Sequence, residues 1–347
     1  MRCLIVGSGL AAIAMAEHLR THDIGVDLIS IRSHGASTVA AGILNPTVLK
    51  RYTAAWKSSL FIDYALPFYN SLEDLLQQKF FEPLPIHRVF NTPAEANDWM
   101  VAADHPSLAP FLEAKIQAST TSPFFAPNGY GRLLGVGRLN IQMLINGYTR
   151  FLGNQYTEAY FDHSKLNLST AQPKYNGVSY DHLFFCEGYQ LKNNPWFGDL
   201  PLTGTKGEML LIRSEQLPKN AIWKGPIFIA PVDAQHFWVG ASFNWTQKND
   251  QPTQKDRIWL EKKLNQMVRV PYQIVDHMAG VRPTVIDRRP LLGTHPKHHQ
   301  LHVFNGLGTR GGLMAPLLAK WLYQFVFEEK SLPQEVSISR FAQLPSS

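Results

Sequence analysis

The sequence contains few groups that could form cross-links or bind metals. Its 347 residues include only two cysteines, Cys3 and Cys186, each in an apolar, strand-like stretch. We expect both to be buried free thiols, which fits a reducing compartment better than a disulfide-rich secreted protein. The 13 histidines do not cluster at the spacing of metal ligands, so we expect no metal site.

Long hydrophobic runs and a strong charge are also missing. No apolar stretch reaches the roughly 18 residues of a membrane helix, and the start MRCLIVGSG lacks the regions of a signal peptide. We therefore expect a cytoplasmic protein without a transmembrane segment. The formal net charge is +6, with no dense block of Lys or Arg. This charge is compatible with an anionic cofactor, an anionic substrate or nucleic acid.

The N-terminus has the pattern of a dinucleotide-binding unit. Arg2–Val6 predicts a buried strand, Leu10–Arg20 a helix and Val26–Ile31 a second strand. A strand, a tight turn, a helix and a strand within about 30 residues form the context that a dinucleotide fingerprint requires.

The turn between this strand and helix is GSGLAA. Gly7 permits the tight turn, and Gly9 lets the backbone approach a pyrophosphate. The small Ala12 allows close packing of helix on strand, and the N–H groups at the helix start face the phosphates. At the end of the second strand, Ser30 occupies the place where such units usually carry a ribose-binding carboxylate.

Further elements follow from hydrophobic periodicity. Helices are predicted at 58–78, 139–151, 254–267 and 313–327; strands at 182–186 and 301–304; short alternating strands between 206 and 239; and a loop of small residues at 32–46.

Two motifs in the C-terminal part complete a family pattern. The first is AGVRP at 279–283, followed by Asp287 and PLLG; the second is NGLGTRGGLMAP at 305–316. With GSGLAA, STVAAGILNP, GVGRLN and LFFCEGY before them, the sequence resembles the D-amino-acid oxidase superfamily of FAD-dependent oxidoreductases over nearly its whole length. Glycine oxidase, sarcosine oxidase and D-amino-acid dehydrogenase belong to this group. The C-terminal turn most resembles the FAD domain of the bifunctional tRNA methylaminomethyl-uridine enzyme, whose methyltransferase half has no counterpart here.

The resemblance implies an FAD that is not covalently bound, because the flavin-linking residues of sarcosine oxidases have no clear match. The implied cofactor-binding residues are Gly7, Gly9, Leu10, Ala11, Ala12, Ser30, Arg32, Ser37, Thr38, Ala40, Ala41, Gly42, Gly188, Gly306, Gly308, Thr309, Gly311, Gly312 and Leu313.

The resemblance also implies which residues meet the substrate. Arg282 would anchor its carboxylate, since a guanidinium binds a carboxylate through two parallel hydrogen bonds; the alternative is an internal salt bridge to Asp287. Arg310 would add positive charge near the flavin or reach the substrate, unless it is a surface arginine on a tight turn. Lys50 and Arg51 either line the mouth of the site or begin a solvated helix.

Phe228 stands where relatives often have an active-site tyrosine, three residues before a proline. The missing hydroxyl argues against a plain glycine-oxidase specificity.

We expect a fold that is α/β and α+β, with a Rossmann-like FAD-binding domain and an interleaved substrate domain built on an antiparallel sheet. The expected FAD-binding domain comprises residues 1–75, 135–200 and 278–347, and the substrate domain residues 76–134 and 201–277.

The implied reaction is oxidation of the C–N bond of an amino acid or N-substituted glycine by hydride transfer to flavin, followed by imine hydrolysis. One alternative is FAD-dependent modification of the tRNA wobble uridine, although no basic, aromatic-laced patch supports nucleic acid as a partner. Another is a catalytically silent flavin-binding protein, which Phe228 and Ser30 favour slightly.

Overall fold

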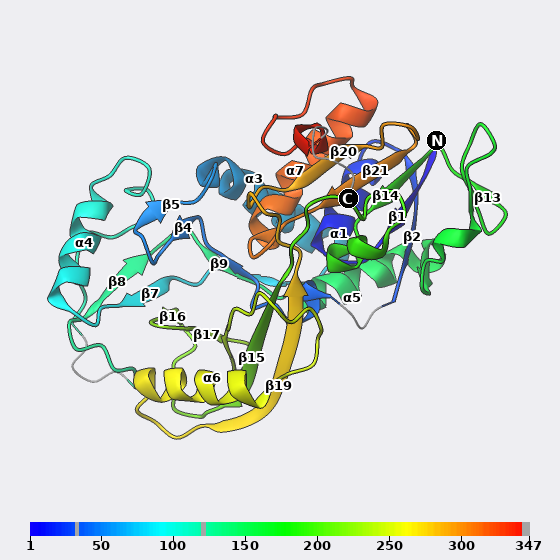
Figure 1. Ribbon diagram of the computed structural model, residues 1–347. Coiled ribbons are helices and arrows are strands. Elements are labelled where there is room, and N and C mark those ends of the chain that lie inside the picture. Colours follow the sequence, from blue (N-terminus) through cyan, green and yellow to red (C-terminus); the bar gives the residue numbers. More distant parts are fainter. Residues whose placement is uncertain (32–34, 119–122, 342–347) are drawn as a thin grey trace.

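The chain folds into two lobes that lie side by side (Figure 1). The computed structural model describes residues 1–31, 35–118 and 123–341. One lobe holds both the N-terminal strands and the C-terminal helix, and the other holds most of the middle of the chain. No helix within these described residues is long and apolar enough to cross a membrane.

The first lobe is built on a mainly parallel sheet in the order β10-β2-β1-β14-β21-β20. Its strands are β1 (Arg2–Val6), β2 (Gly25–Ser30), β10 (Tyr156–Glu158), β14 (His182–Phe185), β20 (Leu291–Thr294) and β21 (Leu301–Asn305). The pairs from β10 to β21 are parallel, and the edge strand β20 is antiparallel to β21. The chain therefore returns to this sheet from three distant segments.

Helices cover one face of the parallel sheet, and a small antiparallel sheet covers the other. The helices are α1 (Leu10–Arg20), α3 (Ser58–Leu76), α5 (Ile141–Leu152) and α7 (Gly311–Phe327), whose buried residues form one apolar cluster. The small sheet consists of β11 (Leu166–Asn167), β12 (Lys174–Tyr175) and β13 (Val178–Ser179). Because α1 and α7 pack together, the start of α7 lies near the start of α1.

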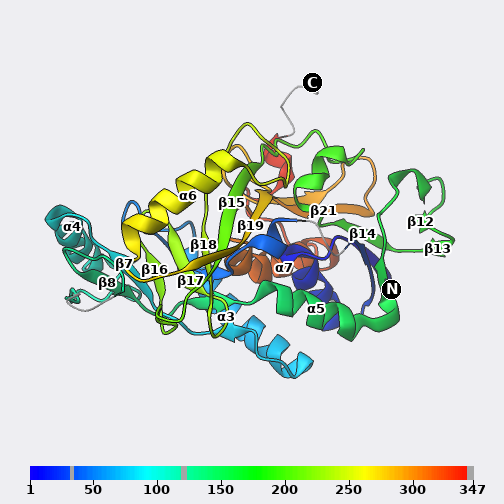
Figure 2. The same ribbon diagram turned by 90° about the horizontal axis from the view of Figure 1, so that it is seen from below.

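The second lobe is built on a sheet in the order β19-β15-β18-β17-β16-β7-β8. Its strands are β7 (Ile86–Val89), β8 (Tyr130–Leu133), β15 (Thr205–Arg213), β16 (Ile222–Lys224), β17 (Phe228–Pro231), β18 (His236–Gly240) and β19 (Gln273–Arg282). The neighbouring strands are antiparallel except β16 and β7, which are parallel. Helix α4 (Pro93–Ala103) lies beside β8, and α6 (Gln254–Met267) packs against β15 and β18 (Figure 2).

Alternation along these strands gives the second sheet two different faces. Leu210 and Ile212 of β15 pack with Leu260 of α6 in an apolar core, whereas Gly207 and Met209 point to the opposite face. Successive side chains of a strand point to opposite faces, so one sheet can serve a core and a cavity. The residues of this sheet that face the cavity are Gly207, Met209, Lys224, Phe228, Trp238, Gly240, Gly280 and Arg282.

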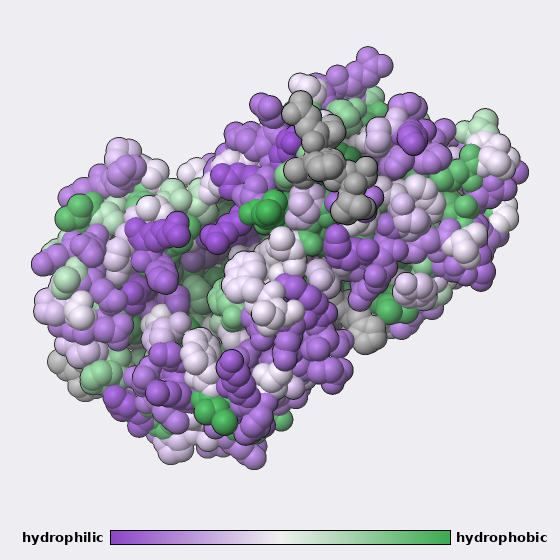
Figure 3. Space-filling view, in the orientation of Figure 1, coloured by the Kyte–Doolittle hydropathy of each residue, from purple (hydrophilic) through white to green (hydrophobic). Residues whose placement is uncertain are grey.

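Short elements connect the two lobes. They are α2 (Ala36–Val39), β3 (Ile43–Leu44), β4 (Thr47–Val48), β5 (Thr53–Ala54), β6 (Phe81–Glu82) and β9 (Gly137–Leu139). Strand β9 pairs with both β3 and β6. The space-filling view of this side of the molecule is mostly hydrophilic, with hydrophobic residues scattered over it (Figure 3).

The structure confirms the expected fold class and most of the predicted elements. The first strand and helix and the helix at 254–267 have the predicted bounds. The loop expected at 32–46 was wrong in part, because residues 36–39 form one helical turn and residues 43–44 pair with β9. Both thiols are free and buried, as predicted. The division into two domains stays a prediction, although each sheet draws its strands almost entirely from one of the predicted sets of segments.

The stability of the first lobe should fall in mild acid because His18 is buried in α1. Its side chain lies near the rings of Tyr64 and Phe68, and Nε2 donates to the Pro316 carbonyl at 3.1 Å. Burial lowers the pKa of His18 to about 4. Since the unfolded chain binds the proton more tightly, His18 favours unfolding as the pH falls below about 6.5.

Replacing His18→Gln keeps a donor for the Pro316 carbonyl but removes this titration. Between pH 7 and pH 5 the wild type should lose about 2 kcal/mol more free energy of unfolding than the variant. Urea unfolding at the two pH values measures this difference. The control is His299→Gln, which removes an exposed histidine and should keep the wild-type loss. Equal losses in wild type and His18→Gln would contradict the assignment.

Candidate functional site

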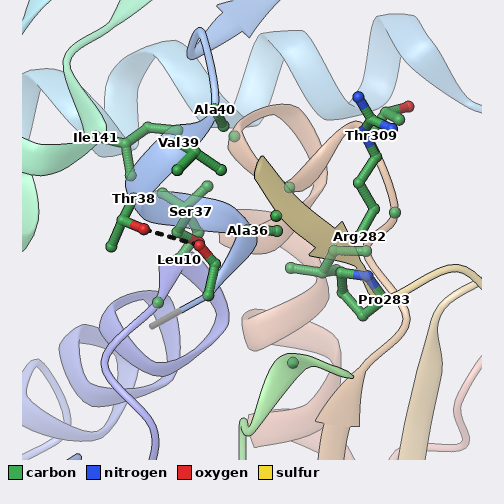
Figure 4. A pocket seen from close by; sticks show the side chains of 18 of the residues that line it. Leu10, Ala36, Ser37, Thr38, Val39, Ala40, Ile141, Arg282, Pro283 and Thr309 are labelled. Atoms are coloured by element: carbon green, nitrogen blue, oxygen red, sulfur yellow. Dashed lines mark hydrogen bonds between the residues drawn. The ribbon is translucent and has the colours of Figure 1, made fainter. Parts of the chain in front are cut away.

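A cavity of about 720 Å³ runs between the two lobes. Its walls come from the carboxyl ends of β1 and β2, from α2, from the second sheet and from the turn before α7. Figure 4 shows Leu10, the residues of α2, Ile141, Arg282 and Thr309 around this space. In doubly wound sheets, ligands bind at this position, outside the carboxyl ends of the strands.

The glycine turn after β1 forms the floor of the cavity. Gly7 has a φ of +119°, and a Cβ there would lie 2.4 Å from the Cys186 carbonyl oxygen. Gly9 precedes α1, and no side chain caps the helix, so its first N–H groups are available to a ligand. Leu10 and Ala11 line the cavity. Ala12 does not: it is fully buried, where its small side chain permits the close packing of α1 that the fingerprint implies. Its role as a cofactor contact stays a prediction.

One end of the cavity is polar and includes Ser30. The Ser8 hydroxyl donates to the Ser30 hydroxyl at 3.0 Å, which in turn donates to the Ile31 carbonyl. On the other side of this end, the Glu187 carboxylate accepts hydrogen bonds from His163 at 3.1 Å and from Asn194 at 2.7 Å. Glu187 was missed from the sequence, although it adjoins the predicted Gly188. Arg32 lies outside the described residues.

The segment with α2 joins the first lobe to the second. Ser37, Thr38, Ala40, Ala41 and Gly42 all line the cavity, and their contact with the cofactor stays a prediction. The Trp238 indole N–H donates to the Val39 carbonyl at 2.9 Å. Sequence reasoning did not find Trp238, because its position in β18 shows only in the alternation of HFWVG.

The turn before α7 forms the wall opposite α2. Gly308, Thr309, Gly311, Gly312 and Leu313 line the cavity. The Tyr69 hydroxyl holds this turn by donating to the Gly312 carbonyl at 2.7 Å. Gly306 was predicted as a cofactor contact, but it does not line the cavity. A Cβ on Gly306 would lie 2.7 Å from Val285, so this glycine serves the packing of the turn.

Arg310 connects this turn to the segment that follows α2. One guanidinium nitrogen donates to the Asn45 carbonyl at 2.7 Å and the other to the Thr47 carbonyl at 3.1 Å. Burial lowers the pKa of Arg310, but an arginine remains charged at neutral pH. Of the predicted roles, the structure supports positive charge in the cavity wall better than direct binding of a substrate.

Arg282 lies at the end of β19, where the sheet meets the cavity. Its guanidinium passes over Gly207, where a Cβ would lie 2.1 Å from Nη2. Nη1 donates to the Ser242 carbonyl at 3.3 Å, and the guanidinium carbon lies 4.5 Å from the centre of the Phe243 ring. Burial lowers the pKa of Arg282 to about 10, so it carries a full charge near neutral pH.

The alternative partner proposed for Arg282 is engaged elsewhere. The Asp287 carboxylate forms a 2.8 Å ion pair with Arg340. Among the described residues, no carboxylate forms an ion pair with Arg282. The guanidinium therefore keeps donors for a ligand in the cavity.

The remaining predicted residues divide between the cavity and the surface. Lys50 and Phe228 line the cavity, whereas Arg51 does not and is exposed. The structure adds Lys224, which the sequence analysis missed. The sequence marks Lys224 only weakly, as a lysine that precedes Gly-Pro between two short strands.

The family model of FAD dependent oxidoreductases, DAO, matches residues 2–325. The chain belongs to this family. The resemblance found in the sequence is thereby confirmed, and the cofactor of this FAD-dependent oxidoreductase is FAD.

Solved structures share the fold of this DAO-family protein. Iminodiacetate oxidase from Chelativorans sp. BNC1 has a TM-score of 0.80 at 17% identity and covers 96% of this chain and 98% of its own. Glycine oxidase from Geobacillus kaustophilus has a TM-score of 0.76 at 17% identity and covers 95% and 96%.

A sequence relative is the tRNA 5-methylaminomethyl-2-thiouridine biosynthesis bifunctional protein MnmC of Idiomarina loihiensis. It is 30% identical over 155 residues, which are 41% of this chain and 25% of the relative. The DAO-family chain thus matches about a quarter of that protein's length.

The residues present fit FAD. Gly188 lines the cavity with a φ of +58°, and a Cβ built there would have no protein atom within 4 Å, so the space beside it is open to a ligand. The start of α1 offers N–H groups to a pyrophosphate, and the turn at 308–313 offers backbone to a flat ring.

Removing the Arg310 guanidinium should loosen the segment after α2. Arg310→Met leaves the Asn45 and Thr47 carbonyls without their charged donor, and we expect a loss of about 3 kcal/mol in unfolding free energy. We also expect weaker FAD binding, because the segment adjoins the cavity. Urea unfolding and FAD titration of the apoprotein measure the two effects. Arg51→Met, a nearby exposed arginine, should change neither, and matching losses in both variants would contradict the role of Arg310.

Proposed function

We propose that the protein oxidises the C–N bond of an amino acid or an N-substituted glycine. The observation that carries this proposal is Arg282: a partly buried guanidinium in the wall of the FAD cavity, without an ion-paired carboxylate among the described residues. A guanidinium in this state favours an anionic ligand, and a carboxylate fits its two parallel donors.

The structure around Arg282 supports an anchoring role. Gly207 leaves room for the guanidinium, the Ser242 carbonyl takes one donor, and the Phe243 ring covers one side. These contacts fix the direction of the remaining donors before a substrate arrives. Such preorganisation lowers the entropic cost of binding the carboxylate in one orientation.

The sheet opposite the FAD turn supplies an apolar wall beside the anchor. Met209, Phe228 and Trp238 face the cavity from neighbouring strands. This wall excludes water and would hold the carbon chain of the amine. Bound FAD would supply the acceptor for the hydride on the carbon next to the nitrogen.

The proton balance requires little from the protein. If the amine binds in its neutral form, loss of a hydride gives an iminium ion, and loss of a proton gives the imine. Water then adds to the imine, releasing a carbonyl product and ammonia or a smaller amine. Phe228 has no hydroxyl to donate to the substrate, so we assign orientation to Arg282 and the apolar wall rather than to a tyrosine.

Names of structural relatives support the substrate class. Glycine oxidase and iminodiacetate oxidase are each named for an amine that carries a carboxylate next to the C–N bond. We propose the same arrangement of groups for the substrate of this protein, bound beside a non-covalent FAD.

Replacement of Arg282 tests the proposal. Arg282→Met should lower kcat/KM for the best amino-acid substrate on the order of 100-fold or more, because a carboxylate loses its charged partner in a desolvated site. Anaerobic bleaching of the flavin by D-amino acids, N-methylglycine, proline and glycine gives the rates. Arg213→Met, at the exposed far end of β15, is the control and should keep the parent's rates. Bleaching of the Arg282 variant as fast as the parent would refute the anchor.

Oxidation of a modified tRNA uridine is a second candidate, which the match to MnmC favours. The same Arg282 would then hold the carboxylate of a carboxymethylamino group, with Phe243 and Trp245 exposed beside it. Binding of tRNA that weakens steeply between about 50 and 200 mM salt would support this candidate. Rapid bleaching by a free amino acid, without tRNA affinity, would decide against it.

A further inference from the structure

A second group of positive charges lies in the wall of the same cavity. Lys224 ends β16, and Lys50 follows the segment that Arg310 holds. Within the described part of the chain, neither lysine forms an ion pair with a carboxylate. The proposed reaction with Arg282 uses neither of them.

The contacts of Lys224 leave part of its ammonium group free for a ligand. Nζ donates to the Gly225 carbonyl at 2.7 Å and the Pro226 carbonyl at 3.4 Å, and it lies 4.7 Å from the centre of the Phe228 ring. An ammonium group has three N–H donors, and these two carbonyls take two of them. A neutral amide could hold the same turn without the cost of burying a charge.

The charges around Lys224 are mainly of the same sign. Burial, and then the nearby Arg88 and Lys50, lower the pKa of Lys224 to about 8. Arg88 has a partner in Glu95, at 3.2 Å. Lys50 is exposed and brings a further positive charge to the cavity wall. Like charges held together are unfavourable, and a bound anion would relieve their repulsion.

Strand order separates Lys224 from Arg282. Arg282 and Lys224 come from the outer strands of the order β19-β15-β18-β17-β16. The Arg282 guanidinium, however, lies over Gly207 of β15, and the Lys224 ammonium lies near Phe228 of β17, so the charged groups are separated by about two strand spacings, on the order of 10 Å. Both long side chains line the cavity, and the Lys224 ammonium reaches back over Phe228 of β17. The two cationic positions therefore lie at opposite ends of the apolar wall.

We propose that Lys224, together with Lys50, forms a second anion subsite, and that the substrate carries an anionic group at each end. One carboxylate binds Arg282, and a second carboxylate or a phosphate, separated from it by several atoms, binds Lys224. The orientation of the substrate rests on the proposed function; the subsite itself does not. The apolar wall of Met209, Phe228 and Trp238 lies between the two ends.

Binding of unreactive diacids to the FAD-loaded protein tests the subsite without any oxidation. Heptanedioate and heptanoate differ by one terminal carboxylate, and perturbation of the flavin absorbance gives their dissociation constants. We expect heptanedioate to bind at least tenfold more tightly than heptanoate. In Lys224→Met this advantage should fall below threefold. Lys219→Met removes an exposed lysine of the β15–β16 connection and should keep the advantage.

Two further variants keep the result decisive. If Lys224→Met does not fold with FAD, Lys224→Gln retains donors for the turn carbonyls, and Lys50→Met changes only an exposed residue. Equal affinity of wild type for both acids, or an undiminished advantage in the Lys224 variants that fold and in Lys50→Met, would overturn the subsite. 6-Phosphonohexanoate, which has the same five methylene groups between its two acid groups as heptanedioate, distinguishes a phosphate from a carboxylate preference.

The rates at which two N-substituted glycines are oxidised test whether the subsite serves the proposed reaction. N-(4-carboxybutyl)glycine should reduce the flavin with at least tenfold higher kcat/KM than N-pentylglycine, and Lys224→Met should remove this difference through KM. If neither of these amines and none of the amino-acid panel reduces the flavin, but heptanedioate keeps its advantage, the proposed function is wrong and the subsite stands. If both amines react equally in wild type, the second anionic group is refuted for the substrate.

Discussion

The close approach of backbone at Gly7 is the constraint on which the cavity depends. A Cβ there would lie 2.4 Å from the Cys186 carbonyl oxygen, so any other residue would force the ends of β1 and β14 apart. Because these strand ends meet, α1 starts directly above them, with uncapped N–H groups facing the cavity. Helix α7 packs on α1 and carries the glycine turn at its own start. The floor and one wall of the FAD site therefore follow from a single missing side chain.

In the second sheet, which forms the opposite wall of the cavity, glycines again leave space for neighbouring groups. Gly207 and Gly280 are paired across β15 and β19. The space above Gly207 holds the Arg282 guanidinium, and the space above Gly280 receives Val39 of α2. Larger residues at these positions would separate the lobes and turn the guanidinium away. The absence of a side chain at Gly207 thus leaves the space in which the Arg282 guanidinium lies. The apolar residues on the other face of β15, which pack against α6, hold this strand in place.

Local patterns predicted those parts of the site that local geometry determines. The spacing of Gly7 and Gly9 with the flanking strands gave the dinucleotide unit, and the family pattern around Arg282 pointed to its place in the cavity wall. Lys224 and Trp238 could not be found in this way, because their positions depend on pairing between strands far apart in the chain. The partners of Arg310 are main-chain carbonyls, which every residue has, so no sequence signal marks them.

Two partly buried arginines of the cavity wall differ in how their charges are compensated, and this difference distinguishes a structural role from a binding role. Arg310 donates to two carbonyl dipoles, so it can hold its segment with no anion present. Arg282 has one weak carbonyl contact, and its charge lies in a desolvated wall. The cost of burying Arg282 is therefore offset fully only when an anion is bound. A positive charge that lacks a full set of partners in the free protein gains more from a bound anion than a charge that is already compensated. The same reasoning applies to Lys224 beside Phe228.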